Sequence, residues 1–219
     1  MTAALTLHTY WRSSAAYRVR IALHLKGLAF DSVPVHLVQG GGEQRLPSFA
    51  ARNPQKLVPT LQHGDAVLTQ SLAIIEYLDE TFPDVPLLPG DALSRQRARA
   101  LAQLVACDIH PLGNLRVLQY LEHELQLPPE ARTRWVTRWV RDGLEAFEAL
   151  LQQHGAGDFC IGNAPTIADC ALVPQLYNAR RFGIDLAPYP LIRRIESVCA
   201  ALPAFDAAAP ERQADAPPA

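Results

Sequence analysis

The sequence predicts a two-part fold, a small α/β domain followed by an all-helical domain, and three observations support this prediction. Strand-like and helical apolar patterns alternate over residues 1–82. The segment "PDVPLLPGDA" (residues 83–92) is rich in proline and glycine, which is typical of a linker. Every later periodic segment has helical spacing. With 219 residues, 49% of them hydrophobic, the chain has enough apolar side chains for both cores.

The first elements alternate between strand and helix. "LTLHTY" (Leu5–Tyr10) alternates apolar and polar residues, which indicates a strand. Helical spacing begins near Ala16 and ends at Gly27, a residue type favoured just beyond a helix. "FDSVPVHL" (residues 30–37) predicts a second strand, placed at a sheet edge or a bulge because Pro34 has no N–H to donate.

The rest of the first domain contains two helices and a hairpin. After a flexible glycine-rich loop, a short helix is expected to end before Asn53. "LVPTLQHGDAVLTQ" (residues 57–70) predicts a hairpin that turns at Gly64. Ser71 is then expected to cap the helix "SLAIIEYLDETF". This order predicts a mixed sheet whose first two strands are parallel and whose hairpin adds an antiparallel strand.

The second half of the chain is expected to be helical. Thr166 and Asp169 have the spacing of a capping box, which marks the start of one helix. The expected helical segments run approximately over residues 93–125, 129–154, 166–181 and 190–201. The predicted division is therefore a first domain at 1–82, a linker at 83–92, a helical domain at 93–205 and a disordered Ala/Pro-rich tail at 206–219.

Composition and charge exclude several classes of function. A formal net charge of −2 gives no general attraction to nucleic acid or to an anionic membrane. The N-terminus lacks the basic and apolar regions of a secretory signal, and no apolar run is long enough to span a bilayer. We therefore expect a cytoplasmic protein without nucleic-acid or membrane partners. The seven histidines are scattered, so no metal site is expected.

The positions of the four cysteines bear on any thiol chemistry. Cys107, Cys160, Cys170 and Cys199 match no CxxC pair and no zinc pattern. We interpret them as reduced, buried apolar residues. None lies in the first 106 residues. Thiol chemistry near the N-terminus would therefore need a sulfur from elsewhere in the fold or from a bound ligand.

Several residues are candidates for a site, each with an ordinary structural alternative. Ser13 and Ser14 lie where a helix begins, without an adjacent base. Gln70 and Ser71 lie at another helix N-terminus, which could bind a carboxylate or be no more than a cap. Other candidates have alternatives of the same kind. Pro59 could be cis or an ordinary edge-strand proline, and Arg116 and Arg180 could bind an anion or lie on a solvated surface.

Five stretches together resemble the zeta class of glutathione transferases, and the similarity extends from Leu5 to about Phe205. These stretches are "RSSAAYRVRIALHLKG", "NPQKLVPTL", "QSLAIIEYLDE", "NAPTIADCALVPQ" and "RFGIDLAPYPLI". The resemblance implies a thioredoxin-like N-terminal domain with a mixed four-stranded sheet and a helical C-terminal domain. It further implies a homodimer and glutathione as the cofactor, so that the missing sulfur belongs to the ligand.

The resemblance also assigns roles to residues. Ser13 would donate a hydrogen bond to the glutathione thiolate, with Ser14 as a second hydroxyl nearby. Arginines would bind the carboxylates of the substrate. The catalytic set it implies is Ser13, Ser14, Arg12, Arg116 and Arg180. The glutathione-binding set it implies is Ser13, Ser14, Gln44, Val58, cis-Pro59, Gln70, Ser71, His110 and Asn114.

The activity that the resemblance implies is cis–trans isomerisation of a small unsaturated diacid, maleylacetoacetate to fumarylacetoacetate, as in tyrosine degradation. A thiolate would add reversibly to the conjugated double bond. Maleylpyruvate is an alternative substrate, and conjugation or dehalogenation of small haloacids is an alternative reaction. A non-enzymatic binding module is a further alternative. Ala15 stands where the class commonly has cysteine, which argues against a mechanism that uses a protein thiol there.

Overall fold

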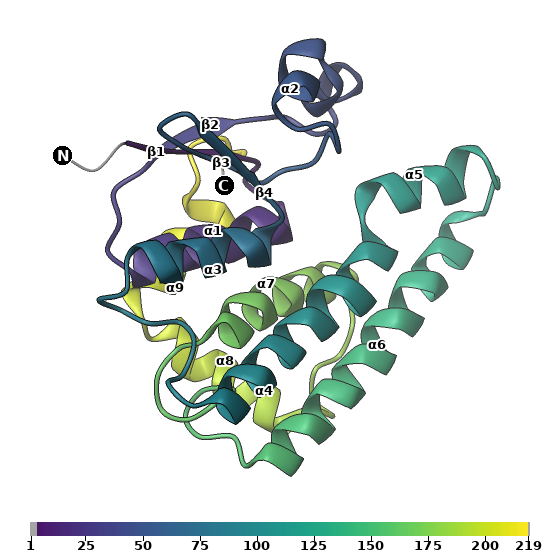
Figure 1. Cartoon of the computed structure of the whole chain (residues 1–219). Helices are drawn as coiled ribbons and strands as arrows, with labels where there is room; N and C mark the ends of the chain where they lie inside the picture. Colours follow the sequence, from purple (N-terminus) through teal and green to yellow (C-terminus); the bar gives the residue numbers. More distant parts are fainter. Residues whose placement is uncertain (1–3, 219) are drawn as a thin grey trace. The chain divides into compact units, whose positions relative to one another are not determined.

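The computed structural model describes residues 4–218, which form two compact units (Figure 1). Unit 1 contains the chain up to Leu87 and the C-terminal segment from Ala201 onward. Unit 2 contains Leu88–Ala200, so the boundary falls inside the predicted linker. No helix among residues 4–218 is long and apolar enough to cross a membrane.

Unit 1 is built on a mixed four-stranded sheet with the order β2-β1-β3-β4. The strands are β1 (Leu5–Thr9), β2 (Asp31–Pro34), β3 (Thr60–His63) and β4 (Ala66–Thr69). β1 pairs in parallel with β2, placing Leu7 beside Ser32, and antiparallel with β3, placing Leu7 beside Leu61. The mixed sheet is confirmed. β2 lies at its edge, where Pro34 is tolerated although it has no N–H to donate.

Helices cover the sheet of unit 1, and the sequence explains where they begin and end. The helices are α1 (Ser14–Leu25), α2 (Pro47–Arg52), α3 (Ser71–Thr81) and α9 (Pro203–Ala208). Figure 1 shows α1 and α3 side by side next to the sheet. Apolar residues of both helices are buried, among them Val19, Ile21, Ile74 and Leu78. Gly27, with φ of 65°, follows the last turn of α1, where a left-handed residue releases the chain toward β2.

The C-terminal segment differs from its prediction. The tail at residues 206–219 was expected to be disordered, but α9 packs against α1, and a 3₁₀ turn follows at Pro210–Arg212. Phe205 and Ala208 are buried, at 2% and 0% exposure. The prediction is wrong for residues 206–218 because an alanine-rich composition does not reveal that these apolar side chains are buried against another helix; Ala219 lies outside the described residues.

Unit 2 is helical, with one interruption that periodicity did not predict. Its helices are α4 (Ala92–Gln103), α5 (Leu115–His123), α6 (Pro129–His154), α7 (Ile167–Arg181) and α8 (Pro190–Ala200). The expected helical segment at 93–125 is not one continuous α-helix, because a π-helical turn at Leu104–Ile109 and a 3₁₀ turn at His110–Gly113 separate α4 from α5. Pro111 has no N–H to donate to a continuing α-helix. Ile109 also packs closely on Gly143, where an added Cβ would lie only 2.3 Å from the Ile109 side chain.

The predicted capping box at the start of α7 is confirmed. Thr166 accepts a hydrogen bond from the Ala168 N–H, and the Asp169 carboxylate accepts from the Thr166 N–H over 2.8 Å. The same carboxylate also accepts from the Thr166 hydroxyl and from the Cys160 N–H. Asp169 is fully buried, so these bonds satisfy a carboxylate that has no access to water.

Replacing Asp169 by asparagine should destabilise the protein strongly. The carboxylate oxygens of Asp169 accept hydrogen bonds, whereas the NH₂ group of asparagine is a donor and would face the same donor groups. Buried N–H groups would then lack an acceptor, at a cost of about 3 kcal/mol. Urea unfolding measures the change in the free energy of unfolding. Asp158→Asn, an exposed change of the same kind in unit 2, should have almost no effect. Equal effects of the two substitutions would contradict this role of Asp169.

Candidate functional site

Ser13 and Ser14 lie at the start of α1, as the sequence predicts, and only Ser13 is the N-cap. The Ser13 hydroxyl oxygen accepts a hydrogen bond from the Ala16 N–H over 3.2 Å. Because a hydroxyl both accepts and donates, its proton can point to a ligand while its lone pair caps the helix. Ser13 is half-buried, whereas Ser14 is 6% exposed. The positive end of α1 adds a favourable potential for an anion beside Ser13.

The buried side chain of Arg20 holds the corner between β1 and α1. Its guanidinium donates to the Thr9 hydroxyl and to the backbone carbonyls of Tyr10 and Trp11. The Tyr10 carbonyl also accepts from the Ser13 N–H over 2.9 Å, so the residues before Ser13 have a fixed course. Sequence analysis missed this residue. Its position between the apolar residues Val19 and Ile21 was the available signal.

Gln44 lies in a loop that glycine makes possible. Its amide nitrogen donates to the Leu37 carbonyl over 3.2 Å, and its amide oxygen is buried without a partner among residues 4–218. Gly42 has φ of 99°, and a Cβ there would come within 2.5 Å of the Gln44 side chain. An unpartnered buried acceptor is unfavourable unless a ligand or water donates to it, so Gln44 is suited to bind an N–H group.

Val58 and Pro59 form the second part of the site in unit 1. The peptide bond between them is cis, which is what the resemblance implied. Val58 packs in a small core cluster with Tyr10, Val35 and Phe49. Its backbone N–H and C=O lie just before β3 and make no hydrogen bond to the residues that the structure describes. They can therefore pair with an extended peptide-like ligand, as in strand addition.

The Gln70–Ser71 corner corrects one expectation. Ser71 is not the cap of α3 but its first residue, and its hydroxyl accepts from the buried Arg18 guanidinium over 3.2 Å. Gln70 is the N-cap, with φ of 68°, and no side chain caps this helix among the described residues. The amides of the first turn, with the helix dipole, can therefore bind a ligand carboxylate. Gln70 itself donates to Gln55 over 2.8 Å.

The remaining candidate of unit 1 is Arg12. Its guanidinium lies 5.3 Å from the centre of the Trp11 ring, which is a cation–π contact between neighbouring side chains. Within unit 1, Arg12, Ser13 and Ser14 are thus consecutive at the start of α1, while Gln44, Val58–Pro59 and Gln70–Ser71 occupy three loops at the ends of strands and helices. These are places where peptide groups are available to a ligand.

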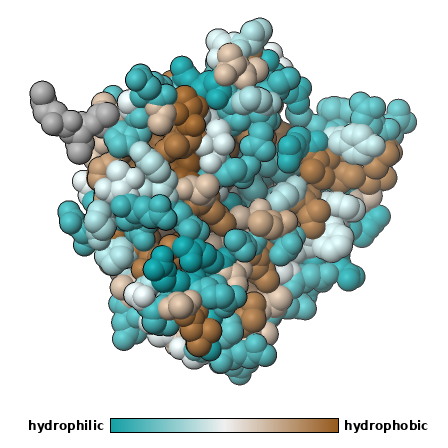
Figure 2. Space-filling view, in the orientation of Figure 1, coloured by the Kyte–Doolittle hydropathy of each residue, from teal (hydrophilic) through white to brown (hydrophobic). Residues whose placement is uncertain are grey.

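The other four candidates belong to unit 2. His110 and Asn114 lie on the turn between α4 and α5, with the Asn114 side chain 3.4 Å from the His110 ring. Asn114 also caps α5, and Arg116 is exposed on the first turn of that helix. Figure 2 shows hydrophobic side chains over α5, where Tyr120 is 55% exposed. This end of unit 2 therefore presents an arginine and apolar surface together.

Arg180 is placed differently from Arg116. It lies near the end of α7 and forms a bidentate ion pair with Glu196 of α8. Hydrogen bonding to Glu196 raises the pKa of Arg180. The carboxylate of Glu196 occupies one side of the guanidinium, which leaves the outer N–H groups for a second carboxylate. No ion pair of Arg116 is present among residues 4–218, so the Arg116 guanidinium is the more available of the two. Sequence analysis missed Glu196, because a partner sixteen residues away on another helix leaves no local pattern.

The protein thiols lie in unit 2 and are poor nucleophiles where they are buried. Cys160, Cys170 and Cys199 are fully buried, and Cys107 is exposed. Burial, with the neighbouring Asp169 carboxylate, raises the pKa values of the Cys160 and Cys199 thiols. Unit 1 therefore has hydroxyls and free peptide groups but no sulfur nucleophile of its own. Among residues 4–218, no group of three or more His, Cys, Asp or Glu side chains could hold a metal ion.

The fold defines a class of protein, with a thioredoxin-like unit and a helical unit, as in glutathione transferases. Two family models match the chain, the N-terminal domain of glutathione S-transferase at residues 7–86 and the C-terminal domain of glutathione S-transferase at residues 129–211. The chain belongs to the glutathione S-transferase family.

Individual relatives within this family are also similar to the chain over nearly its whole length. A protein from Vibrio cholerae described as a probable maleylacetoacetate isomerase is 49% identical over 97% of this chain and 99% of its own. A solved holo structure of maleylpyruvate isomerase, described as a bacterial zeta-class transferase, has a TM-score of 0.93 and 47% identity over 97% of this chain and 100% of its own. A third relative is a maleylacetoacetate isomerase from Anaeromyxobacter dehalogenans, solved with dicarboxyethyl glutathione and citrate in the active site. Its TM-score is 0.84, and it is 44% identical over 98% of this chain and 94% of its own.

The positive φ of Gln70 generates a prediction. A β-branched residue is strained in this conformation, so Gln70→Val should lower the free energy of unfolding by about 1–3 kcal/mol. Gln70→Gly should cost less, because glycine adopts a positive φ without strain. Urea unfolding of both variants tests this. The control is Gln62→Val in strand β3, where valine is favoured. A Gln70→Gly variant less stable than Gln70→Val would contradict the strain.

Proposed function

We propose that this protein is a glutathione-dependent cis–trans isomerase of a small unsaturated diacid of the maleylacetoacetate type. The observation that carries the proposal is the start of α1, where Ser13 keeps a hydroxyl proton available at a positive helix end in a unit without any cysteine. Such a corner is suited to hold a thiolate that a ligand brings. The family membership and the named relatives support the proposal.

The described residues fit glutathione. The unpartnered Gln44 oxygen and the free peptide groups of Val58 suit an extended peptide. The uncapped start of α3, at Gln70 and Ser71, suits the γ-glutamyl carboxylate. We include His110 and Asn114 as further contacts, on the resemblance alone. When bound, glutathione supplies a thiolate that adds reversibly to a conjugated double bond, so that the bond can rotate.

The residues of the chain contribute stabilisation of charge and orientation. The Ser13 hydroxyl donates to the sulfur and favours its ionised form, with Ser14 as a second, more buried hydroxyl. Arginine side chains hold the carboxylates of the diacid and stabilise negative charge that develops beside the double bond. Arg12 and Arg116 have the more available guanidiniums, and Arg180 is a weaker contact because Glu196 already engages it. Ala15 takes no part in this scheme.

The finer identity of the substrate is a choice between maleylacetoacetate and maleylpyruvate. The relatives bear both names. Each substrate is a diacid whose cis double bond is conjugated to one of its two carboxylates. We propose maleylacetoacetate as the physiological substrate, in the degradation of tyrosine. The proposal also includes a cytoplasmic homodimer, which rests on the resemblance.

Ser13→Ala should lower turnover at least about tenfold, the effect of raising the pKa of the bound thiol by one unit. Because Ser13 also caps α1, this variant should lose about 1 kcal/mol of stability. Ser13→Gly separates the two effects, since glycine is a good cap without a hydroxyl and should lose turnover but little stability. A steady-state assay with a cis diacid and glutathione measures turnover. Wild-type turnover in both variants would remove Ser13 from the mechanism.

Arg116→Ala should raise the KM for the diacid more than the KM for glutathione, because only the diacid would lose a carboxylate contact. The increase should be about tenfold, in the range of one charge-assisted hydrogen bond. Arg180→Ala should have a smaller effect, since Glu196 limits its donors. Arg194→Ala, an exposed change of equal charge on α8, is the control. If KM for the two substrates rises equally in Arg116→Ala, the carboxylate role is wrong.

A further inference from the structure

The residues before Ser13 are held by the C-terminal segment of the chain as well as by α1. The Trp11 N–H donates to the Asp215 carboxylate over 2.9 Å, across 204 positions of sequence. Trp11 lies two residues before Ser13, and the Ser13 N–H donates to the Tyr10 carbonyl on the other side of Trp11. Asp215 thus bonds to the middle of the short turn that leads into Ser13.

Asp215 also complements the buried guanidinium of the same corner. Arg20 donates to the Tyr10 and Trp11 carbonyls and, from its Nε, to the Ala208 carbonyl at the end of α9 over 2.9 Å. Burial lowers the pKa of Arg20 to about 10, and the Asp215 charge acts against this change. The C-terminal segment therefore contributes both a carbonyl and a negative charge to the group that holds the turn.

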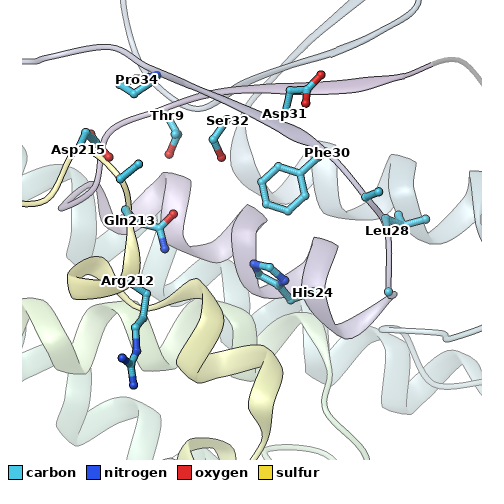
Figure 3. Close-up of a pocket in the computed structure, with 13 residues that line it drawn as sticks. Thr9, His24, Leu28, Phe30, Asp31, Ser32, Pro34, Arg212, Gln213 and Asp215 are labelled. Carbon is cyan, nitrogen blue, oxygen red and sulfur yellow. The ribbon is translucent and has the colours of Figure 1, made fainter.

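Residues 212–215, which follow the packed helix α9, are attached to the rest of unit 1 by a few polar contacts and border a cavity. A cavity of about 760 Å³ lies between residues 212–215, the end of α1 and strand β2. Figure 3 shows Asp215 at the strand side of this cavity, near Thr9 and Pro34, while the Arg212 side chain points away from the strands. Gln213 donates to the Ala207 and Ala209 carbonyls within the segment itself. The hydrogen bond from Trp11 is therefore the direct link from this stretch to the turn.

We propose that Asp215 is a positioning residue for Ser13: through the Trp11 N–H it sets the course of the turn that aims the Ser13 hydroxyl at the reacting sulfur. This proposal rests on the proposed function for its catalytic consequence. Its structural part, the ordering of the turn by the C-terminal segment, stands independently of which substrate the protein isomerises.

The test compares three Asp215 variants and one control variant of the full-length protein. Asp215→Ala removes the acceptor and should lower kcat about tenfold, with a smaller change in the KM for glutathione, because binding groups elsewhere are kept. Asp215→Asn keeps an oxygen that can accept from Trp11 and should recover most of kcat. Asp215→Glu keeps the charge but moves the acceptor by one methylene, and its kcat should lie between the two; it serves if Asp215→Ala does not fold. Asp206→Ala removes an exposed carboxylate of the same segment, which pairs with Arg212, and should match the wild type.

Two further readouts separate positioning from general destabilisation. In Asp215→Ala, or in Asp215→Glu if the former does not fold, the apparent pKa of the bound thiol, from the pH profile of kcat, should rise. Hydrogen exchange at the Trp11 amide should accelerate in that variant while exchange in the centre of α1 stays slow. A variant with wild-type kcat and wild-type Trp11 exchange would overturn the proposal, as would an equal loss in Asp206→Ala. If the wild type shows no glutathione-dependent isomerisation, the proposed function fails, and the exchange measurement alone decides whether Asp215 orders the turn.

Discussion

The N-terminal unit depends on the hydrogen bonds that the buried guanidinium of Arg20 donates. This guanidinium is a fully buried cation that donates to three backbone carbonyls and one hydroxyl. A buried charge is tolerated only where hydrogen bonds and opposite charge replace its hydration, so the surrounding carbonyls must keep their positions. The hydroxyl belongs to Thr9 at the end of β1, and the carbonyls belong to the turn before Ser13 and to the end of α9. One side chain thereby ties the start of the chain, its first helix and its C-terminal segment together.

The turn that Arg20 holds leads to Ser13, where the proposed function places an anionic sulfur brought by a ligand. Ser13 begins α1 with its oxygen engaged in the cap and its proton available. The other loops of unit 1 offer an unpartnered amide oxygen at Gln44, free peptide groups at Val58 and an uncapped helix start at Gln70. Each of these is a local cost that a bound peptide would offset. Burial raises the pKa values of the Cys160 and Cys199 thiols, and the exposed Cys107 belongs to unit 2. Unit 1 has no cysteine, so the proposed mechanism takes its reactive sulfur from a ligand.

Sequence patterns predicted what depends on neighbouring residues and missed what depends on distant ones. The capping box of Thr166 and Asp169 needs only a three-residue spacing, and it was predicted correctly. The break between α4 and α5 depends on the close packing of Ile109 on Gly143, which no window of periodicity contains. The cap of α3 was assigned to Ser71 because serine is a common cap, whereas the backbone places Gln70 there with a positive φ. The tail was judged from composition, and its bond to Trp11 spans almost the whole chain.

The same distinction applies to the candidate site. The position of Ser13 at a helix start was predicted because two serines there form a local pattern, and its role stays a prediction from the resemblance. The state of Arg180 could not be predicted, since Glu196 lies on a different helix. Arg20 and Asp215 were missed because neither lies in a motif that is typical of catalytic residues. A signal for Arg20 was present, however, because a charged residue between Val19 and Ile21 in an apolar helix indicates a buried side chain with hydrogen-bond partners.

In the proposed mechanism the reactive sulfur belongs to glutathione and not to the protein. The most direct measurement is the isomerisation rate of a cis diacid with dialysed enzyme, to which either glutathione or S-methylglutathione is added. S-methylglutathione offers the same peptide groups but no ionisable thiol. The account predicts isomerisation with glutathione, none without it, and inhibition by S-methylglutathione when both are present. Full activity of the dialysed enzyme alone, or with S-methylglutathione, would contradict it.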